Sequence, residues 1–271
     1  MITSISNPRM KELAQMQRRS RARNQAGVFI VEGLRMVREI PYERLEQLYV
    51  TEEFYDRYKT EPIFSAKKEF VSSQVFEYIS DTKNPQGILA VVRQYKYSEE
   101  EVVAKTGYGE GTGRKRPAHI LVLDNLQDPG NLGAMFRTAE AAGATGILLS
   151  QDCVDIYNPK VIRSTMGAIF RMPFVYVEDL PTPIENLKKQ GIHVYAAHLK
   201  GGHTYDKEDY TKGTAFLIGN EGNGLRKEIA QCADTWIQIP MEGKAESLNA
   251  ATAAAILMYE VSRQRRSLLI D

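Results

Sequence analysis

The chain has 271 residues, of which 43% are hydrophobic and 25% are charged, and its formal net charge is +1. These values are typical of a globular protein with one large or two modest domains, and they exclude a polycation. No apolar run approaches the roughly 18 residues of a membrane span, and the N-terminus lacks a signal-peptide core. The two cysteines and four histidines have neither disulfide nor metal-site spacing. We therefore expect a cytoplasmic protein with no membrane segment and no metal.

The first 24 residues are strongly basic, with six positive charges against the single acid Glu12, a local excess of five. The basic residues are Arg9, Lys11, Arg18, Arg19, Arg21 and Arg23. Such a segment can attract a polyanion such as RNA. A solvated helix face is the alternative interpretation.

Strands and helices alternate over the first 95 residues. The predicted helices are 11–19, 34–39, 52–58 and 74–79, and the predicted strands are 28–31, 48–50, 69–71 and 87–92. This alternation predicts a small α/β domain over residues 1–95.

A change in composition follows this region. Residues 106–117, TGYGEGTGRKRP, contain four glycines and no core-forming apolar residue. Such a segment is typical of a linker. We therefore expect a linker over residues 96–117 and a second domain over residues 118–271.

The second domain repeats the alternation with longer apolar strands. The predicted strands are 119–125, 146–150, 174–177, 193–197, 215–219 and 236–239, and the predicted helices are 130–142, 159–166, 184–190, 225–232 and an alanine-rich helix from residue 250. Strands without polar alternation predict a parallel sheet that is buried on both faces. The fold class is therefore α/β.

Three polar loops each follow an apolar strand of this domain. Loops at the carboxyl ends of parallel strands converge on one site. In the first loop, NLQDPGNLGAMFR, Asn131 can cap the following helix, and Arg137 can bind phosphate oxygens through its rigid fork. The second, GNEGNGL, carries three glycines that let backbone approach a ligand, with Glu221 among them. In the third, residues 239–249, Ser247 or Asn249 can cap the alanine-rich helix.

Each loop alone also fits a purely structural interpretation, as a capped helix or a tight turn. The glycine loop matches neither GxGxxG nor a Walker motif, so it supports neither dinucleotide nor triphosphate binding. It is the presence of three such loops in one domain that favours a ligand site.

The motifs DPGNLGAMFRTAEAAG, LIGNEGNGL and IPMEGKAESLNAATAAAILMYE resemble, in order and spacing, those of the SpoU (TrmH-type) RNA 2′-O-ribose methyltransferases of the SPOUT superfamily. The segment NPKVIRSTMGAIFRMPF is similar to the family's stretch between the first two motifs. The first domain, with KELAQMQRRSRARNQAGVFIVEGLRMVREI, is similar to the family's substrate-binding domain.

The resemblance implies a trefoil knot at the carboxyl end of the second domain and a homodimer. It implies S-adenosylmethionine as the cofactor, held mainly by backbone groups at Gly219, Ile239 and Leu248. The family's functional side chains fall on Asn131, Arg137, Glu221, Ser247 and Asn249, and none of these positions departs from the family pattern.

The resemblance further implies 2′-O-ribose methylation of RNA, and the extra first domain favours ribosomal RNA as the substrate. A guanidinium is a poor base. Our hypothesis is therefore that Arg137 anchors the phosphate and polarises the ribose. Asn131, Ser247 and Asn249 would position the hydroxyl, and Glu221 would hold Arg137 or the cofactor loop. The alternatives are a transfer RNA methyltransferase and a non-catalytic RNA-binding or ribosome-assembly protein on the same fold.

Overall fold

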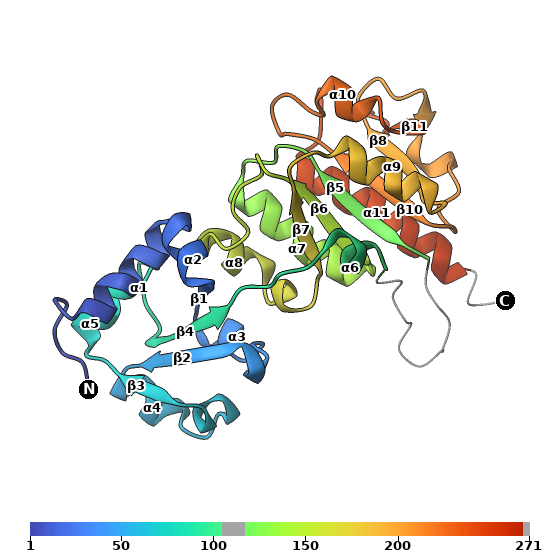
Figure 1. Ribbon diagram of the computed structural model, residues 1–271. Coiled ribbons are helices and arrows are strands. Elements are labelled where there is room, and N and C mark those ends of the chain that lie inside the picture. Colours follow the sequence, from blue (N-terminus) through green and yellow to red (C-terminus); the bar gives the residue numbers. More distant parts are fainter. Residues whose placement is uncertain (105–116, 268–271) are drawn as a thin grey trace. The chain divides into compact units, whose positions relative to one another are not determined.

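A computed structural model describes residues 1–104 and 117–267 of the chain (Figure 1). The contacts divide it into two compact units. The first unit comprises Met1–Tyr95 together with Asp155–Phe170, and the second comprises Lys96–Val154 and Arg171–Asp271. Among the described residues, no helix is long and apolar enough to cross a membrane.

The first unit is built on a four-stranded sheet with the strand order β1-β4-β2-β3. Strands β2 and β3 are parallel, and the other pairs are antiparallel. The strands are β1 (Val28–Glu32), β2 (Leu45–Val50), β3 (Lys68–Phe70) and β4 (Ile88–Arg93). The helices are α1 (Pro8–Arg18), α2 (Ser20–Ala26), α3 (Leu34–Val37), α4 (Glu52–Tyr58), α5 (Ser73–Ile79) and α8 (Pro159–Thr165). The prediction of a small α/β domain here is confirmed.

Apolar faces of α1 and α5 cover this sheet. Met10 and Leu13 of α1 pack with Val75 and Ile79 of α5 in one buried cluster, which also contains Ile30 of β1. The helix starts follow local sequence, because short polar side chains satisfy the free N–H groups of a first turn. The side chain of Ser72, for example, accepts from the backbone N–H of Val75.

The segment Asp155–Phe170 leaves the second unit and packs on β1. The rings of Phe29 and Tyr157 lie 4.7 Å apart, and the Tyr157 hydroxyl accepts from the backbone N–H of Tyr95 at 2.8 Å. Our expected second domain of residues 118–271 is therefore interrupted in the structure, because this segment finds its apolar partners in the first unit.

The second unit contains a seven-stranded sheet in the order β7-β6-β5-β10-β8-β11-β9, and all of its strand pairs are parallel. The strands are β5 (His119–Leu123), β6 (Gly146–Ser150), β7 (Phe174–Val177), β8 (His193–Ala197), β9 (His203–Thr204), β10 (Thr214–Ile218) and β11 (Thr235–Gln238). Every residue of β5, β6 and β10 is buried. The prediction of a parallel sheet buried on both faces is confirmed.

Helices cover both faces of this sheet (Figure 1). Those of the second unit are α6 (Glu99–Ala104), α7 (Pro129–Ala142), α9 (Pro181–Lys189), α10 (Lys227–Ala230) and α11 (Ala250–Ser267). Side chains of α6, α9 and α10 share one buried cluster with the strands. Helices α7 and α11 pack against each other on the opposite face.

The expected linker over residues 96–117 is partly a folded element. Its residues Glu99–Ala104 form α6, and Val102 is fully buried against β6. A Cβ added to Gly146 would lie 2.5 Å from the Val102 side chain, so the two backbones meet closely. The rest of the expected linker, residues 105–116, lies outside the described residues.

Candidate active site

A chain of hydrogen bonds joins the three polar loops at the carboxyl ends of β5, β10 and β11. The Asn131 side-chain N–H donates to Oε1 of Glu221 at 3.0 Å, and the Asn249 side-chain N–H donates to Oδ1 of Asn131 at 2.9 Å. The loops are far apart in sequence, but they follow strands of one parallel sheet, in which β5 and β10 are adjacent and β11 is separated from β10 by β8. The carboxyl ends of these strands lie at one edge of the sheet. The structure thus brings Asn131, Glu221 and Asn249 together.

Helix α7 starts in a way that leaves the Asn131 amide available for this chain. Asp128, rather than Asn131, caps α7, because its Oδ1 accepts from the backbone N–H of Asn131 at 2.8 Å. Our prediction that Asn131 is the cap is therefore wrong. Both residue types are good caps, and the cap that forms lets the Asn131 side chain reach Glu221.

Asn249 has a double role at the start of α11. Its Oδ1 accepts from the backbone N–H groups of Ala251 at 2.9 Å and Thr252 at 3.2 Å. Its amide N–H is thereby aimed at Asn131. The cap predicted at Ser247 or Asn249 is Asn249, and Ser247 is exposed beside it.

Glu221 anchors the first loop through several donors. Its carboxylate accepts from the backbone N–H groups of Asp128 at 3.1 Å and Gln127 at 3.3 Å, as well as from Asn131. Burial raises the pKa of Glu221, but these hydrogen bonds and one from its own backbone outweigh burial, so the pKa lies below its ordinary value. The Glu221 carboxylate therefore holds the first loop. Among the described residues, no hydrogen bond or ion pair joins it to Arg137.

The glycine-rich loop after β10 is closed by backbone alone. Asn220 and Gly224 exchange N–H to carbonyl hydrogen bonds of 3.0 and 2.9 Å. A Cβ at Gly219 would lie 2.1 Å from the backbone nitrogen of Leu225 and could not be accommodated. The Asn220 side chain donates to the carbonyl of Asn125 at 2.8 Å, which ties this loop to the one after β5.

This loop and the third loop enclose a pocket of about 420 Å³. Ser247, Leu248 and Ile239 line it, together with Gly219 and Glu221. Most of the remaining lining residues are glycine or apolar, among them Ile218, Leu225, Ile237 and Leu257. Apolar walls suit an adenine ring, and the volume falls in the range of roughly 300–1,000 Å³ that holds small ligands. The lining thus fits S-adenosylmethionine.

An ion pair not anticipated from the sequence joins the end of β5 to the residue that follows the glycine-rich loop. The Asp124 carboxylate is fully buried at the end of β5, and it accepts from the backbone N–H of Arg226 at 2.9 Å and from Nε at 2.8 Å. Arg226 directly follows the glycine-rich loop. The available signal in the sequence was an acidic residue directly after the apolar run of residues 120–123, because a buried carboxylate requires a partner.

Arg137 lies on α7, two turns beyond Asn131, and is exposed. Within the described residues it makes no hydrogen bond or ion pair. Its guanidinium is therefore available to a ligand.

The basic residues of the first unit do not behave as one group. Arg9 pairs with Glu69 at 3.2 Å, while Lys11, Arg18, Arg19 and Arg21 are exposed. Arg23 is only 3% exposed, and its guanidinium donates to Asp155 and to the carbonyls of Met16 and Gln17. Our expectation that Arg23 contacts RNA is therefore wrong, because the side chain is buried and both of its terminal nitrogens donate inside the unit.

Two family models match the chain. Residues 118–259 match the SpoU rRNA Methylase family, and residues 7–90 match the MRM3-like substrate binding domain. The chain belongs to the SpoU rRNA methylase family. Members of this family are RNA methyltransferases that use S-adenosylmethionine, so the pocket beside Gly219 is the expected place of that cofactor.

Two of the similar proteins match nearly the whole chain, and a third matches part of it. The 23S rRNA (guanosine(2553)-2′-O)-methyltransferase RlmP of Bacillus subtilis is 32% identical over 96% of this chain and 98% of its own length. The AdoMet-bound rRNA methyltransferase of Sinorhizobium meliloti has a TM-score of 0.79 and 28% identity, and the match covers 97% of each chain. The TrmH/SpoU tRNA modifying enzyme of Aquifex aeolicus (A. aeolicus) covers 64% of this chain and 83% of its own, with a TM-score of 0.52 and 28% identity.

Proposed function

We propose that this protein transfers a methyl group from S-adenosylmethionine to the ribose 2′-hydroxyl of a nucleotide in 23S ribosomal RNA. The single observation that carries the proposal is the chain Asn249–Asn131–Glu221, which lies beside the apolar pocket. Polar side chains that are fixed by one another next to a cofactor pocket can hold a hydroxyl in one orientation.

In the proposed mechanism the cofactor supplies an electrophilic sulfonium methyl group. The task of the protein is to align the hydroxyl and to exclude water, and good alignment can contribute roughly 7–11 kcal/mol. Asn131, Ser247 and Asn249 position the ribose. Arg137 binds the neighbouring phosphate, because its free guanidinium can make paired contacts with phosphate oxygens.

Glu221 acts in this mechanism as a positioning residue. Its Oε1 accepts from Asn131 and Asp128, and its Oε2 accepts from Gln127. Both oxygens are engaged, and the lowered pKa makes the carboxylate a weak base. Glu221 therefore fixes the first loop and does not take the hydroxyl proton.

Ribosomal RNA is favoured over transfer RNA by the extent of the matches. The rRNA enzymes of Bacillus subtilis and Sinorhizobium meliloti cover nearly the whole chain, whereas the match to the tRNA modifying enzyme stops at 64%. The first unit, which matches a substrate binding domain, supports the same choice. A protein that acts on ribosomal RNA would work in the cytoplasm.

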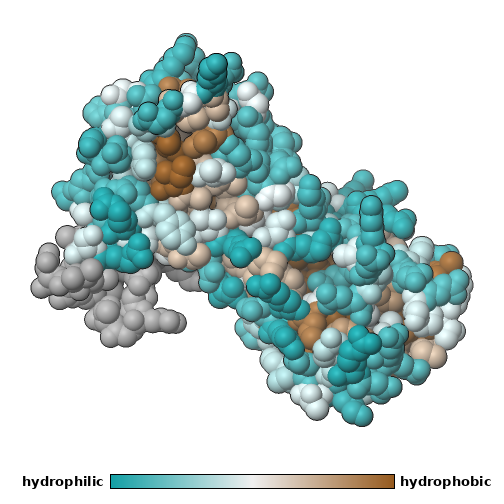
Figure 2. Space-filling model, turned by 180° about the vertical axis from the view of Figure 1, so that it is seen from behind, coloured by the Kyte–Doolittle hydropathy of each residue, from teal (hydrophilic) through white to brown (hydrophobic). Residues whose placement is uncertain are grey.

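We further propose a trefoil knot around α11 and a homodimer that pairs the α7 and α11 faces. Ala250, Ala253 and Leu257 of α11 line the cofactor pocket, as expected of a helix threaded past the third loop. Figure 2 shows hydrophobic residues gathered on the face of the second unit that is turned away in Figure 1. On α11, Ala255 and Ile256 are only half-buried, and Tyr259 is 47% exposed. A second copy would cover these side chains.

The direct test is methyl transfer in vitro. The purified protein is incubated with methyl-labelled S-adenosylmethionine and 23S ribosomal RNA from cells that lack the protein, and the modified nucleotide is mapped. We expect one 2′-O-methyl site, with transfer RNA unlabelled. Cofactor binding by calorimetry together with no transfer to any RNA would instead indicate a non-catalytic RNA-binding protein, and labelled transfer RNA would correct the substrate.

A further inference from the structure

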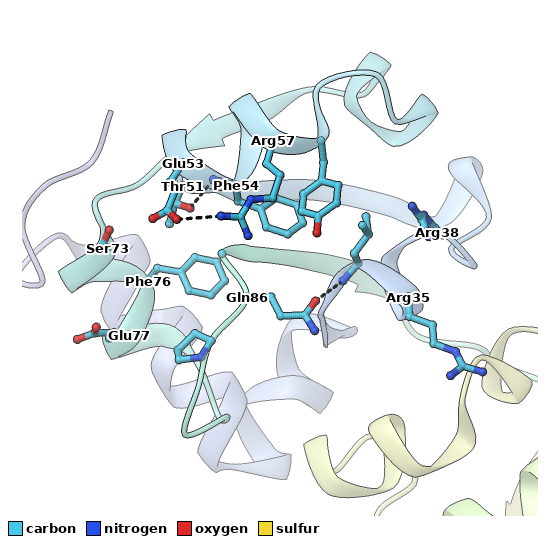
Figure 3. Close-up of a pocket in the computed structure, with 14 residues that line it drawn as sticks. Arg35, Arg38, Thr51, Glu53, Phe54, Arg57, Ser73, Phe76, Glu77 and Gln86 are labelled. Atoms are coloured by element: carbon cyan, nitrogen blue, oxygen red, sulfur yellow. Dashed lines mark hydrogen bonds and ion pairs between the residues drawn. The ribbon is translucent and has the colours of Figure 1, made fainter.

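The first unit contains a second pocket, of about 670 Å³, that the methyl-transfer site does not use. It lies between α4, α5, the start of α3 and the segment Pro85–Gly87. Figure 3 shows Phe54 and Arg57 on one side of the pocket, facing Phe76 and Gln86 on the other. The volume lies in the range of roughly 300–1,000 Å³ that is typical of small-ligand sites.

The wall formed by Gln86 and Gly87 is held rigidly. Oε1 of Gln86 accepts from the backbone N–H of Leu34 at 3.0 Å, which fixes the side chain across the start of α3. Gly87 has a φ of +98°, and a Cβ there would lie 2.5 Å from Oγ1 of Thr51. With its carbonyl oxygen engaged, Gln86 presents its amide N–H groups, which have no partner among the described residues.

The two ends of the pocket differ in charge. Figure 3 shows Glu53, Ser73 and Glu77 toward one end, and Arg38 and Arg35 at the other, where the Arg35 side chain extends outward from the rim of the pocket. Arg38 is paired with Glu61, but Arg35 is exposed and makes no ion pair within the described residues. One unpaired cation is therefore available at the basic end.

An aromatic wall lies between these ends. Phe54, Tyr58 and Phe76 line the pocket, and the rings of Phe54 and Tyr58 are 4.6 Å apart. Phe54 and Phe76 are buried, whereas Tyr58 is half-buried, and its hydroxyl makes no hydrogen bond within the described residues. The Tyr58 ring is thus the aromatic face that a ligand can reach.

We propose that this pocket binds one unpaired nucleotide of the RNA substrate, with its phosphate at Arg35 and its base against Tyr58. The proposal rests on RNA methylation as the function and adds a recognition site for single-stranded RNA. Unpaired bases of RNA are recognised by stacking on aromatic side chains and by hydrogen bonds to their edges.

The mixed charges distinguish a nucleotide from simpler ligands. Glu53 is paired with Arg57 at 3.5 Å, whereas Glu77 makes no ion pair among the described residues. A bare phosphate or a duplex backbone gains nothing from Glu77, because a carboxylate repels it. The amino groups of a base can donate to Glu77, and Gln86 can donate to a base acceptor. The match of this unit to a substrate binding domain favours a nucleotide within RNA over a free mononucleotide.

The test measures binding of the full-length protein to a single-stranded hexanucleotide and to a duplex of the same length. Both are measured with S-adenosylhomocysteine filling the cofactor pocket and at one salt concentration, because salt weakens phosphate contacts. For Arg35→Gln and Tyr58→Leu we expect the single strand to bind about tenfold more weakly. Duplex binding should change less than twofold.

Arg93→Gln is the matched control. Arg93 is 56% exposed and pairs with the exposed Glu46 of the same unit, so the substitution removes a comparable charge outside the pocket. Thermal unfolding checks that Tyr58→Leu is folded. Because Arg35 is exposed, Arg35→Gln tests the pocket even if Tyr58→Leu does not fold. Losses no larger than those of Arg93→Gln, or equal losses for single strand and duplex, would overturn the proposal.

Two further readouts define the ligand and separate this proposal from the function. If adenosine 5′-monophosphate bound as tightly as the hexanucleotide and lost the same affinity in both variants, the site would be one for mononucleotides and the RNA assignment would be wrong. Selective loss of single-strand binding by a protein that methylates no RNA would reject the proposed function and support the pocket. Unchanged binding in variants of an active methyltransferase would reject the pocket alone.

Discussion

The side-chain amide of Asn131 donates to the carboxylate of Glu221 over 3.0 Å, although 90 positions separate the two residues. The other end of the same amide accepts from Asn249 at 2.9 Å. With one partner at each end, the Asn131 amide has a single orientation, since a flip would face donor against donor and acceptor against acceptor. The three family motifs are therefore coupled through one side chain.

Glu221→Gln should disturb this coupling without unfolding the protein. In the wild type, the backbone N–H groups of Gln127 and Asp128 donate to the carboxylate of Glu221. Glutamine keeps one acceptor oxygen, but its amide N–H group would face one of these donors. We expect kcat to fall by about tenfold or more and the free energy of unfolding to fall by only about 1 kcal/mol, because the side chain is exposed. Single-turnover kinetics and urea unfolding measure the two effects. Unchanged turnover would show that Glu221 does not position the site.

The stability that Glu221 contributes should depend on pH in a defined direction. Its folded-state pKa lies below the ordinary 4.5, so the contribution is present above pH 4.5 and is lost as the pH falls through the lowered value. The difference in unfolding free energy between wild type and Glu221→Gln should therefore be constant from neutral pH to about pH 5 and shrink below about pH 4. A difference that grew on acidification would contradict the direction of the shift.

Asn249 allows its capping role to be separated from its role in the site. Asn249→Asp keeps an oxygen that caps α11 but removes the side-chain N–H that donates to Oδ1 of Asn131. We expect stability near wild type and a loss of turnover of at least tenfold. Asn249→Ala should lose turnover and also about 1 kcal/mol of stability. If Asn249→Asp retained full activity, the bond to Asn131 would have no part in the reaction.

The buried strands were predictable from sequence because short apolar segments are stable only where they are shielded from water, as in the interior of a sheet. Strands such as β6 and β7 were located to the residue for this reason. The sequence did not predict whether a side chain contacts a neighbour in the chain or a residue of a distant segment. Asp128 and Asn131 are both good caps, and in the structure Asp128 caps α7 while Asn131 donates to Glu221. Helix α6 was missed because Val102 is buried by side chains of distant strands and helices, which its own segment does not reveal.

Gly219 should tolerate no side chain. The Cβ of Gly219→Ala would lie 2.1 Å from the backbone nitrogen of Leu225, so the glycine-rich loop would have to move. We expect the Kd for S-adenosylmethionine to rise by about tenfold or more, measured by calorimetry. Gly222→Ala is the control in the same loop, since its Cβ would meet its nearest neighbour at an ordinary 3.5 Å. Equal affinities of the two variants would place the cofactor elsewhere.

Arg137 should matter for turnover and not for stability. It is exposed and pairs with nothing among the described residues, so Arg137→Ala should change the unfolding free energy by less than about 0.5 kcal/mol. Turnover should fall by about a hundredfold, and Arg137→Lys should recover little of it, because an ammonium cannot make the paired contacts of a guanidinium. Near-normal turnover of Arg137→Lys with unchanged RNA affinity would remove this role.

Arg23 and Arg21 should respond in opposite ways, although they are close in sequence. Arg23→Met leaves Asp155 and the carbonyls of Met16 and Gln17 without their donor, so we expect a loss of about 2–3 kcal/mol, reduced by the partial exposure of Asp155. Arg21 is exposed, and Arg21→Met should leave stability unchanged while weakening RNA binding. Urea unfolding and filter binding test the pair. A fully stable Arg23→Met that bound RNA less tightly would return Arg23 to the RNA-binding surface.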